Sequence, residues 1–342
     1  IQLTENQIIN SVVPMSLESE ISGEDWMGDF LSPMAVDLQI NGGLGIAFPE
    51  LTFKDIPTLY SLLDLLWNDG VEAIAPTIVT SSVASLRQAL LVLREVRQEK
   101  AKHRCRLLGA HLEGPFLSRD FLGAHNQEFL ALPSLEALEE RISGFENEIS
   151  LVTLAPELPN SMVVIKKLKE LGIVVSLGHS SADSEISKIA FDEGIAMLTH
   201  TFNAMAPLHH RSPGPVGAAL SHGNIALGVI ADGVHLHPEI IVLLQRLASK
   251  KLVLVSDALS PYGLPDGQYS WDKRVIFSKG GACRLENGTL AGVTLPLLEG
   301  CKRLAKWSGN FGASIWSATI SPRQVITGKS VKIEEFLIGS SL

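Results

Sequence analysis

Three potential metal ligands each stand at the end of a short apolar run of the chain. Glu113, His179 and His200 all follow segments that are rich in Val, Ile, Leu and Ala. One carboxylate oxygen and two imidazole nitrogens form a common ligand set for a catalytic divalent ion, because they leave positions open for water and substrate. The sequence therefore predicts that these three residues bind one divalent metal ion.

Asp257 ends a further apolar segment, residues 252–256, and is the candidate general base. A divalent ion lowers the pKa of water towards ~7, so an ordinary carboxylate can accept the proton at neutral pH. The predicted reaction is metal-assisted hydrolysis of an amide or a related bond. In the simpler interpretation Asp257 only caps a turn and Glu113 is a structural carboxylate, but a buried carboxylate without a partner is costly.

Eight apolar segments are typical of buried parallel strands. They cover residues 34–40, 71–79, 106–112, 149–155, 173–178, 195–199, 225–230 and 252–256. Helical periodicity lies between most of them, over residues 53–68, 82–98, 134–142, 160–171, 182–193 and 238–249. The alternation predicts a (β/α)8 barrel, which we refer to as TIM-like, whose active site lies on the loops after the strands. An open doubly wound sheet is the main alternative, but no GxGxxG turn follows the first segment.

The barrel is expected to occupy residues 34–310, and two parts of the chain do not fit its repeat. Residues 1–33 and 311–342 are predicted to form a small β domain, which is incomplete because little sequence precedes the first barrel strand. Residues 267–290 alternate around a Gly-Gly turn, a pattern that predicts an inserted hairpin.

The composition is typical of a globular protein and excludes several function classes. Hydrophobic residues make up 46% and charged residues 19% of the 342 residues, and 28 basic against 37 acidic side chains give a net charge of −9. The acidic balance without a basic stripe argues against nucleic acid as a partner. No apolar run reaches the ~18 residues of a membrane span, so no membrane partner is expected. Three widely spaced cysteines without CxxC spacing favour a reducing, cytoplasmic location.

Five blocks of sequence, taken together, resemble one enzyme family. They are VDLQINGG (36–43), GAHLEGPFLS with GAHN (109–118 and 123–126), LGHS (177–180), THTFNAM with a later Arg and Pro-Gly (199–214), and ADGVHLH with VSDA (231–237 and 255–258). Each block alone is a modest signal, whereas HLEGP, HTFNAM and VSDA in this order are specific. Residues 30–310 resemble the N-acetylglucosamine-6-phosphate deacetylases of the amidohydrolase superfamily.

The resemblance implies a metal-dependent hydrolase of amino-sugar catabolism, which converts N-acetylglucosamine 6-phosphate into glucosamine 6-phosphate and acetate. It implies the same three metal ligands, one divalent ion per subunit (Zn²⁺ first, Fe²⁺ as the alternative), and Asp257 as the base that later acts as the acid. His125 is expected to stabilise the oxyanion of the tetrahedral intermediate.

The resemblance also implies substrate contacts and a partner subunit. The implied sugar and acetamide contacts are Ala124, His125, Asn203 and Ala204, and the implied acetyl-covering loop is Leu290, Ala291 and Gly292. Arg211 and His235 are implied as contacts of the sugar phosphate, for which a guanidinium fork is well suited. Phosphate contacts in the family can come from a second subunit, so a homodimer is expected.

Some positions depart from related amidohydrolases. Gln39 and Asn41 stand where relatives carry an HxH pair, and residues 155–157 lack the lysine that bridges two metals, so a single-metal site is expected. Leu122 stands where the family often has a lysine. Three alternatives remain at this point: an amidohydrolase for another N-acyl substrate, a catalytically silent ligand-binding relative, and a phosphosugar isomerase on the same barrel.

Overall fold

The computed structural model describes residues 2–4, 8–12, 30–99 and 101–330. Eight parallel strands form its central sheet, in the spatial order β13-β12-β11-β10-β9-β8-β6-β3. Their bounds are β3 Ala35–Ile40, β6 Val71–Val79, β8 Ala110–Glu113, β9 Ile149–Leu154, β10 Val174–Leu177, β11 Ile195–Leu198, β12 Ala226–Val229 and β13 Leu252–Leu254. The short strand β7 Arg106–Leu107 precedes β8 and also pairs with β6. All eight predicted strand segments are therefore confirmed.

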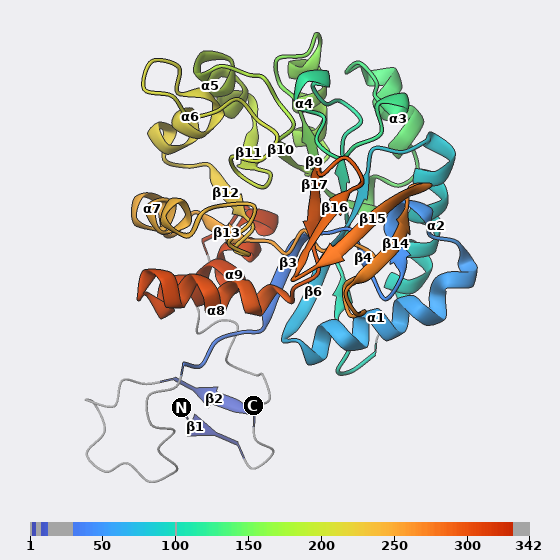
Figure 1. Ribbon diagram of the computed structural model, residues 1–342, viewed down its shortest axis with the longest axis vertical. Coiled ribbons are helices and arrows are strands. Elements are labelled where there is room, and N and C mark those ends of the chain that lie inside the picture. The colour runs from blue at the N-terminus through green and yellow to red at the C-terminus, as the bar shows by residue number, and fades with distance from the viewer. Residues whose placement is uncertain (1, 5–7, 13–29, 100, 331–342) are drawn as a thin grey trace.

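The two edge strands of this sheet meet, which makes the sheet a nearly closed barrel. The backbone N–H of Asp257 donates to the carbonyl of Gln39 at 2.8 Å, and that of Asn41 donates to the carbonyl of Ala258 at 2.7 Å. Strand order follows chain order throughout, without the reversal of a doubly wound sheet. The predicted TIM-like barrel is confirmed, and Figure 1 shows helices surrounding its strands.

The surrounding helices cover the outer face of the strands with apolar side chains. Their bounds are α1 Ile56–Asn68, α2 Val83–Gln98, α3 Leu135–Ile142, α4 Ser161–Glu170, α5 Ser184–Glu193, α6 Gly214–His222, α7 Pro238–Ala248, α8 Leu297–Ser308 and α9 Phe311–Thr327. Leu59, Leu62 and Leu66 of α1 recur at helical spacing and belong to the same buried cluster as Ile74 of β6. Ser82 caps α2 by accepting the N–H of Ser85 at 3.1 Å.

Helix α9 corrects the predicted domain division at the C-terminal side. Residues 311–327 are helical and contact β3 and β13, so they cover the barrel and do not form part of a β domain. Its Asn310 N-cap and its small buried residues, among them Ser314 and Ala318, allow close packing on the strands. Pro322 and the run of β-branched residues conceal this helix in the sequence.

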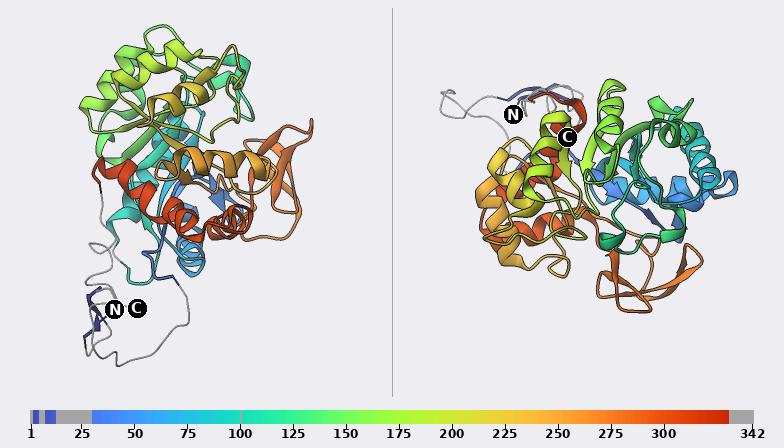
Figure 2. Two further views of the ribbon diagram at one scale, coloured as in Figure 1. Left: turned by 90° about the vertical axis from the view of Figure 1, so that its left-hand side faces the viewer. Right: turned by 90° about the horizontal axis from the view of Figure 1, so that it is seen from above.

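An inserted antiparallel sheet follows the last barrel strand. It consists of β14 Gly267–Trp271, β15 Arg274–Lys279, β16 Ala282–Leu285 and β17 Leu290–Val293. The predicted hairpin at 267–290 is confirmed and extended to four strands. The N–H of Leu259 donates to the carbonyl of Val293 at 2.9 Å, which ties β17 to the segment after β13. Figure 2 shows this orange sheet standing out from one side of the barrel.

The remaining elements are short. An antiparallel pair, β1 Gln2–Leu3 and β2 Ile9–Ser11, lies within residues 1–33 of the predicted β domain. Residues 13–29 and 331–342 of that predicted domain lie outside the described residues. Strands β4 Gly42–Gly43 and β5 Ile46–Ala47 form a small hairpin after β3. The 3-10 helices are Phe48–Glu50, Phe53–Asp55, Arg119–Phe121, Gln127–Phe129 and Glu146–Glu148.

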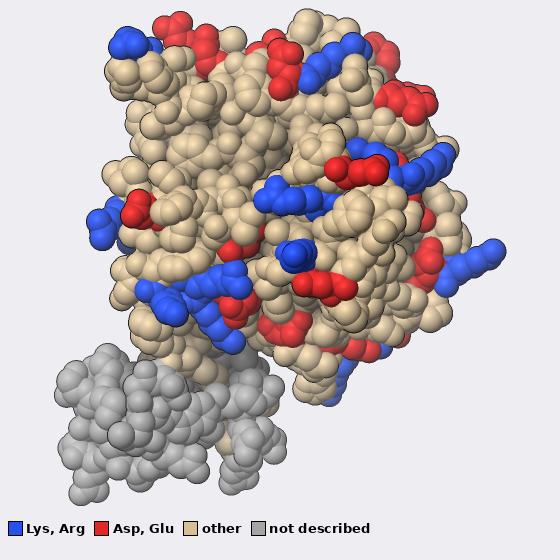
Figure 3. All heavy atoms as spheres, viewed as in Figure 1, with Lys and Arg blue, Asp and Glu red and all other residues tan. Residues whose placement is uncertain are grey.

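Surface charge and hydropathy agree with the composition. Acidic and basic side chains are interspersed over the face that Figure 3 presents. None of the helices in the described part of the chain combines the length and the apolar character that a membrane crossing requires.

Candidate metal centre and active site

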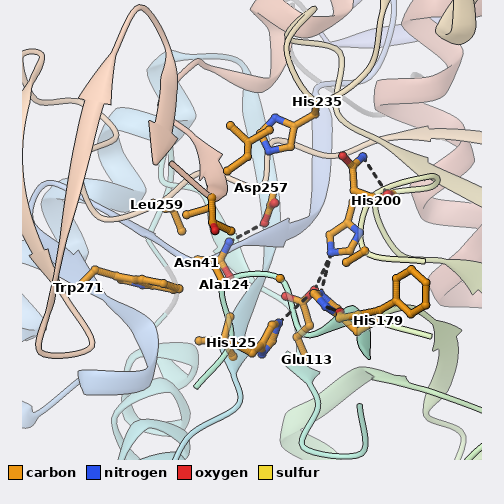
Figure 4. A pocket seen from close by; sticks show the side chains of 18 of the residues that line it. Asn41, Glu113, Ala124, His125, His179, His200, His235, Asp257, Leu259 and Trp271 are labelled. Atoms are coloured by element: carbon orange, nitrogen blue, oxygen red, sulfur yellow. Dashed lines mark hydrogen bonds and ion pairs between the residues drawn. The ribbon is translucent and has the colours of Figure 1, made fainter. Parts of the chain in front are cut away.

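The ends of three barrel strands bring the predicted metal ligands together. Glu113 is the last residue of β8, and His179 and His200 each stand two residues after β10 and β11. Glu113 Oε1 lies 3.1 Å from the Nε2 atom of each histidine, and the two Nε2 atoms are 3.0 Å apart. The three side chains are buried, with 3%, 4% and 6% of their residue surface exposed. Figure 4 shows them pointing toward one another.

The hydrogen bond at the far side of His179 sets its tautomer. The carbonyl of Phe121 accepts a hydrogen bond from Nδ1 at 2.9 Å, so the Nε2 atom of the neutral ring carries a lone pair toward Glu113. Burial is the largest influence on this ring and lowers its pKa to about 4, which keeps it neutral. A neutral imidazole with a free Nε2 is the form that binds a metal.

The charge balance of the cluster fits a cation at its centre. Burial alone would raise the pKa of Glu113, but its hydrogen bonds to three histidines outweigh burial and hold the pKa well below its usual range. The carboxylate is therefore ionised, and its oxygen and two ring nitrogens lie within 4.8 Å of one another. Because one anionic oxygen and two ring nitrogens converge in a buried site, a divalent ion suits this ligand set.

Asp257 lies beside the cluster and is held by two amide side chains. Asn41 Nδ2 donates to Asp257 Oδ1 at 2.7 Å, and Gln39 Nε2 donates to the same oxygen at 3.2 Å. Gln39 Nε2 also lies 3.4 Å from Oε1 of Glu113, so it bridges the two carboxylates. Burial, followed by the charge of Glu113, raises the pKa of Asp257. A raised pKa makes this carboxylate a stronger proton acceptor than an exposed one.

Gln39 and Asn41 are residues of the candidate site that could not be predicted from sequence. At the sequence level they are only absent histidines, whereas in the structure both amides hydrogen-bond to the candidate base. Their position at the end of β3, next to the segment that follows β13, becomes apparent only once the barrel closes.

The backbone is strained where these side chains leave their strands. His179, His200 and Asp257 adopt positive φ angles of 49°, 28° and 51°, a region that non-glycine residues seldom occupy. Such conformations cost about 1–3 kcal/mol each and are found where function requires a particular side-chain direction. Gly178 permits close packing before His179, because a Cβ there would lie 2.8 Å from Thr153 Cγ2.

Below the metal ligands, a chain of buried hydrogen bonds crosses the barrel strands. Thr77 Oγ1 lies 3.2 Å from His111 Nδ1, His111 Nε2 lies 2.7 Å from Thr153 Oγ1, and Thr153 Oγ1 lies 2.7 Å from Thr199 Oγ1. Ser176 Oγ continues the chain at 2.6 Å from Thr199 Oγ1. We call Thr77, His111, Thr153, Ser176 and Thr199 the polar belt. It links the strands that carry the three ligands and so fixes their relative positions.

His125 faces the same pocket and is held there by Thr80. Its Nδ1 atom lies 2.9 Å from Thr80 Oγ1 and 3.3 Å from the backbone nitrogen of Thr80. Nε2 lies 3.9 Å from Glu113 Oε1, and the ring contacts His179 edge-on with centroids 4.4 Å apart. The Nε2 side of the ring therefore faces the space beside the metal cluster.

These side chains surround a cavity of about 370 Å³. Several predicted substrate residues line it, namely Ala124, His125, Asn203, Ala204, His235, Leu290 and Ala291. Gly292 is buried behind the wall, and Arg211 is exposed on the loop before α6, so neither lines the cavity. Residues missed by the sequence argument also contribute, among them Val79, Phe121, Leu259 and Trp271.

His235 occupies one end of the cavity and is held in place by its neighbours. Asp232 Oδ2 accepts a hydrogen bond from His235 Nδ1 at 2.7 Å, and Asp232 Oδ1 accepts the backbone N–H of His235 at 2.8 Å. Burial would raise the pKa of Asp232, but these bonds outweigh burial and lower it. The ionised carboxylate fixes the ring so that Nε2 remains free toward the cavity (Figure 4).

Named relatives match most of this chain. A Vibrio furnissii N-acetylglucosamine-6-phosphate deacetylase is 37% identical over 277 residues, which are 81% of this chain and 68% of that protein. The protein of the same name from Bos taurus is 34% identical over 313 residues, 88% of this chain and 76% of that protein. The chain belongs to the N-acetylglucosamine-6-phosphate deacetylase family. No protein-family model matches it.

Solved structures of this deacetylase family agree with the architecture. The Pasteurella multocida N-acetylglucosamine-6-phosphate deacetylase superimposes with a TM-score of 0.83 at 28% identity and covers 96% of this chain and 87% of its own. The Mycobacterium smegmatis enzyme of the same name was solved as an Asp-to-Ala mutant in complex with N-acetylglucosamine 6-phosphate. It superimposes with a TM-score of 0.80 at 27% identity and covers 86% of this chain and 77% of its own. The resemblance and the fold class inferred from sequence are thereby confirmed.

One relative of the family carries a different substrate name. An Escherichia coli protein named N-acetylgalactosamine-6-phosphate deacetylase is 32% identical over 300 residues, 87% of this chain and 78% of that protein. The two substrate names differ by one hydroxyl configuration of the sugar, whereas the acetamide and the 6-phosphate are common to both.

Proposed function

We propose that this chain hydrolyses the acetamide of N-acetylglucosamine 6-phosphate to glucosamine 6-phosphate and acetate, a reaction of amino-sugar catabolism. The observation that carries the proposal is the convergence of Glu113, His179 and His200 beside Asp257, inside a cavity on the barrel of this family. An isomerase would have no use for such a donor set, and a silent relative would have no need of its strained backbone.

Glu113, His179 and His200 are the residues that would hold the metal. When bound there, a divalent ion supplies Lewis-acid polarisation of the amide carbonyl and lowers the pKa of a neighbouring water molecule. We propose zinc as this ion, because one carboxylate and two imidazoles suit it; Fe²⁺ suits the same ligands, and metal analysis of the purified protein distinguishes the two.

Asp257 transfers the proton in both halves of the reaction. Its carboxylate accepts a proton from the attacking water, while the water oxygen bonds to the acetyl carbon. The carbon–nitrogen bond then breaks, and Asp257 returns the proton to the departing amine nitrogen. Water and amide are converted into acetate and amine, so the reaction needs no further reactant.

His125 is proposed to stabilise the negative charge on the carbonyl oxygen during water attack. Its Nε2 atom faces the space beside Glu113, 3.9 Å from Oε1, while Thr80 holds Nδ1, so the ring serves this role when Nε2 carries a proton. In comparable sites, removal of one such donor costs about 10²–10³ in kcat. His125→Ala should therefore lower kcat and leave the metal content unchanged.

We propose that a second copy of the chain completes the phosphate end of the site. Among the described residues that line the cavity, none is Lys or Arg, although a dianionic phosphate calls for a cation. Arg211 is exposed on its own subunit, and among the described residues its guanidinium hydrogen-bonds to the neighbouring His210 at 2.7 Å. A homodimer in which Arg211 reaches the partner's cavity, beside His235, supplies the missing charge.

Mixing two inactive variants tests this arrangement. Asp257→Asn lacks the base and Arg211→Ala lacks the phosphate contact, so a hybrid dimer of the two has one cavity with both groups intact. In co-refolded or co-expressed mixtures, we expect each hybrid dimer to have up to about half of the activity of the unaltered dimer. Sedimentation should show that the protein is a dimer. Activity equal to the sum of the two separate variants contradicts the shared site.

The central experiment is a release assay with metal-loaded protein. N-acetylglucosamine 6-phosphate should yield equimolar acetate and primary amine, while unphosphorylated N-acetylglucosamine should react far more slowly. N-acetylgalactosamine 6-phosphate is the second candidate substrate, because one relative carries that name. Equal rates with and without the phosphate contradict the proposed substrate class, and absence of acetate from all three sugars contradicts the deacetylase activity itself.

A cytoplasmic location remains our proposal and is supported by the cysteines. Cys105, Cys283 and Cys301 are free and buried, and burial raises the pKa of each thiol. Unpaired thiols of this kind are usual in a reducing compartment.

A further inference from the structure

The active-site cavity has both polar and apolar lining residues. Asn203, His235 and Thr289 supply polar groups, which suit sugar hydroxyls and a phosphate. Val79, Leu259 and Trp271 belong to one apolar cluster and form an apolar wall. Within the proposed function, the methyl end of the acetyl group is the only apolar portion of the substrate, so it belongs against this apolar wall.

Trp271 is the largest side chain of the apolar wall. It ends β14 and is 3% exposed. Figure 4 shows its ring projecting into the pocket from the side opposite His179 and His200. The guanidinium of Arg274 stacks 4.8 Å above the ring centroid and donates to the backbone carbonyl of Ala124 at 2.7 Å, so the ring is clamped against the substrate loop.

A second, larger cavity lies on the other side of this wall. Its volume is about 930 Å³, against about 370 Å³ for the active-site cavity. Val79, His125 and Trp271 line both cavities. The second cavity extends between the loop before α2, the segment around Phe129 and the tip of the β14–β15 hairpin. The two spaces are thus neighbours that share a thin partition.

We infer that Trp271 is a specificity-determining residue that limits the N-acyl group to a short chain. Once this side chain is reduced, longer N-acyl groups would extend into the second cavity along its apolar residues Pro49, Leu122 and Phe129, although most of its other lining residues are polar. Val79 belongs to barrel strand β6 and His125 is placed at the reacting carbonyl, so Trp271 is the one bulky member of the partition outside both roles. The inference rests on the proposed function, because it concerns the acyl part of the same substrate.

An alternative role for Trp271 is to stack on the sugar ring. Stacking contributes equally to all substrates that carry the same sugar, whatever their acyl group. A partition, in contrast, changes the ranking of acyl groups. The relative kcat/KM within an acyl series therefore distinguishes the two roles, and it is insensitive to a general loss of folded protein.

The experiment uses the metal-loaded full chain with N-acetyl, N-propionyl, N-butyryl and N-hexanoyl glucosamine 6-phosphate, and follows the common amine product. In the unaltered chain we expect kcat/KM to fall steeply with acyl length. Because one methylene in a tight pocket changes kcat/KM by about 10-fold or more, Trp271→Ala should raise the butyryl-to-acetyl ratio at least 10-fold. Trp271→Leu removes less side-chain volume and should give an intermediate butyryl-to-acetyl ratio. If the alanine variant does not fold, the leucine variant provides the test.

Two control variants accompany these measurements. Trp271→Phe keeps an aromatic partition and should retain the preference for acetyl. Tyr269 is an aromatic residue of the same strand, but its side chain lines neither cavity. Tyr269→Ala therefore tests whether a general loosening of the inserted sheet changes the acyl preference. The inference is overturned if folded Trp271→Ala and Trp271→Leu rank the acyl substrates by kcat/KM in the same way as the unaltered chain. The proposed function would then remain intact. An unaltered, metal-loaded chain that releases no acetate overturns both.

Discussion

The predicted metal ligands and the predicted substrate contacts stand on different parts of the molecule. Glu113, His179 and His200 stand at the ends of barrel strands, are buried, and rest on the polar belt. Asn203 is half-buried on a loop and Arg211 is exposed. Strand ends are fixed by ladder hydrogen bonds and core packing, whereas loops are held by few contacts. The comparison indicates that the barrel fixes the chemistry and the added segments select the substrate.

Removal of the candidate base should give the largest effect, because it acts on chemistry alone. Asp257→Asn keeps the shape of the side chain but cannot accept a proton, so we expect kcat to fall by about 10²–10⁴ with the metal content unchanged. Steady-state kinetics and metal analysis check this. For comparison, Asn203→Ala at the substrate end should raise KM with a much smaller change in kcat. An Asp257→Asn variant with more than a tenth of the original kcat excludes Asp257 as the base.

Interruption of the polar belt should weaken the metal site without touching a ligand. Thr153→Val keeps the side-chain shape and removes the hydroxyl between His111 and Thr199. Loss of such a support typically lowers metal affinity by about 10–100-fold, which competition with a chelator measures. Thr327→Val on α9 is the matched control, because its hydroxyl bonds two backbone groups at the end of that helix and no member of the belt. Equal affinities in the two variants exclude a positioning role for the belt.

Loss of an amide beside the base should change the pH dependence of the reaction. Asn41 donates to Asp257 and so stabilises its ionised form, which lowers the pKa that burial raises. Asn41→Ala removes this bond, so the pKa of Asp257 should rise and the acid limb of the kcat profile should move to higher pH. Below that limb the rate falls up to about ten-fold per pH unit.

The direction of this shift is decisive for the role of Asn41. An acid limb that stays in place, or that moves to lower pH, contradicts the assignment of Asp257 as the base that Asn41 stabilises. Gln39→Ala is the companion variant, and because its bond to Asp257 Oδ1 is longer, at 3.2 Å against 2.7 Å for Asn41, it should give the smaller shift.

The smallest expected effect concerns stability at the junction of the barrel and the inserted sheet. A Cβ on Gly292 would lie 2.6 Å from the carbonyl oxygen of Asp257, so Gly292→Ala should lower the free energy of unfolding by about 1–3 kcal/mol. Gly312→Ala in α9 meets no atom within 4 Å and should raise it by up to about 1 kcal/mol. Thermal and denaturant unfolding measure the free energy of unfolding of the two variants. Equal values for the two would contradict the close packing at Gly292.

The barrel could be predicted from sequence because its signal is periodic. Buried strands of three to nine residues alternate with amphipathic helices such as α1 and α2, and several strand ends carry a polar residue at or just after the last strand position. The metal ligands followed from the same rule, since the ends of parallel strands share one edge of the barrel. Fold and ligand cluster thus depend on patterns that are local in the chain.

The rest depends on contacts between distant segments. Gln39 and Asn41 acquire their role only where β3 meets the segment after β13, and Trp271 reaches the pocket from an inserted sheet more than a hundred residues after Ala124. Helix α9 was missed because Pro322 and small residues weaken its periodicity, although the packing against β3 and β13 overrides these local preferences.

Titration of metal-free protein with Zn²⁺, with acetate release followed at each step, tests the central claim most directly. The claim is that Glu113, His179 and His200 hold one ion that deacetylation requires. The account predicts no activity without metal, a linear rise that ends at one ion per chain, and loss of tight binding in Glu113→Gln. Full activity in the metal-free protein, or unchanged binding and activity in Glu113→Gln, would contradict it.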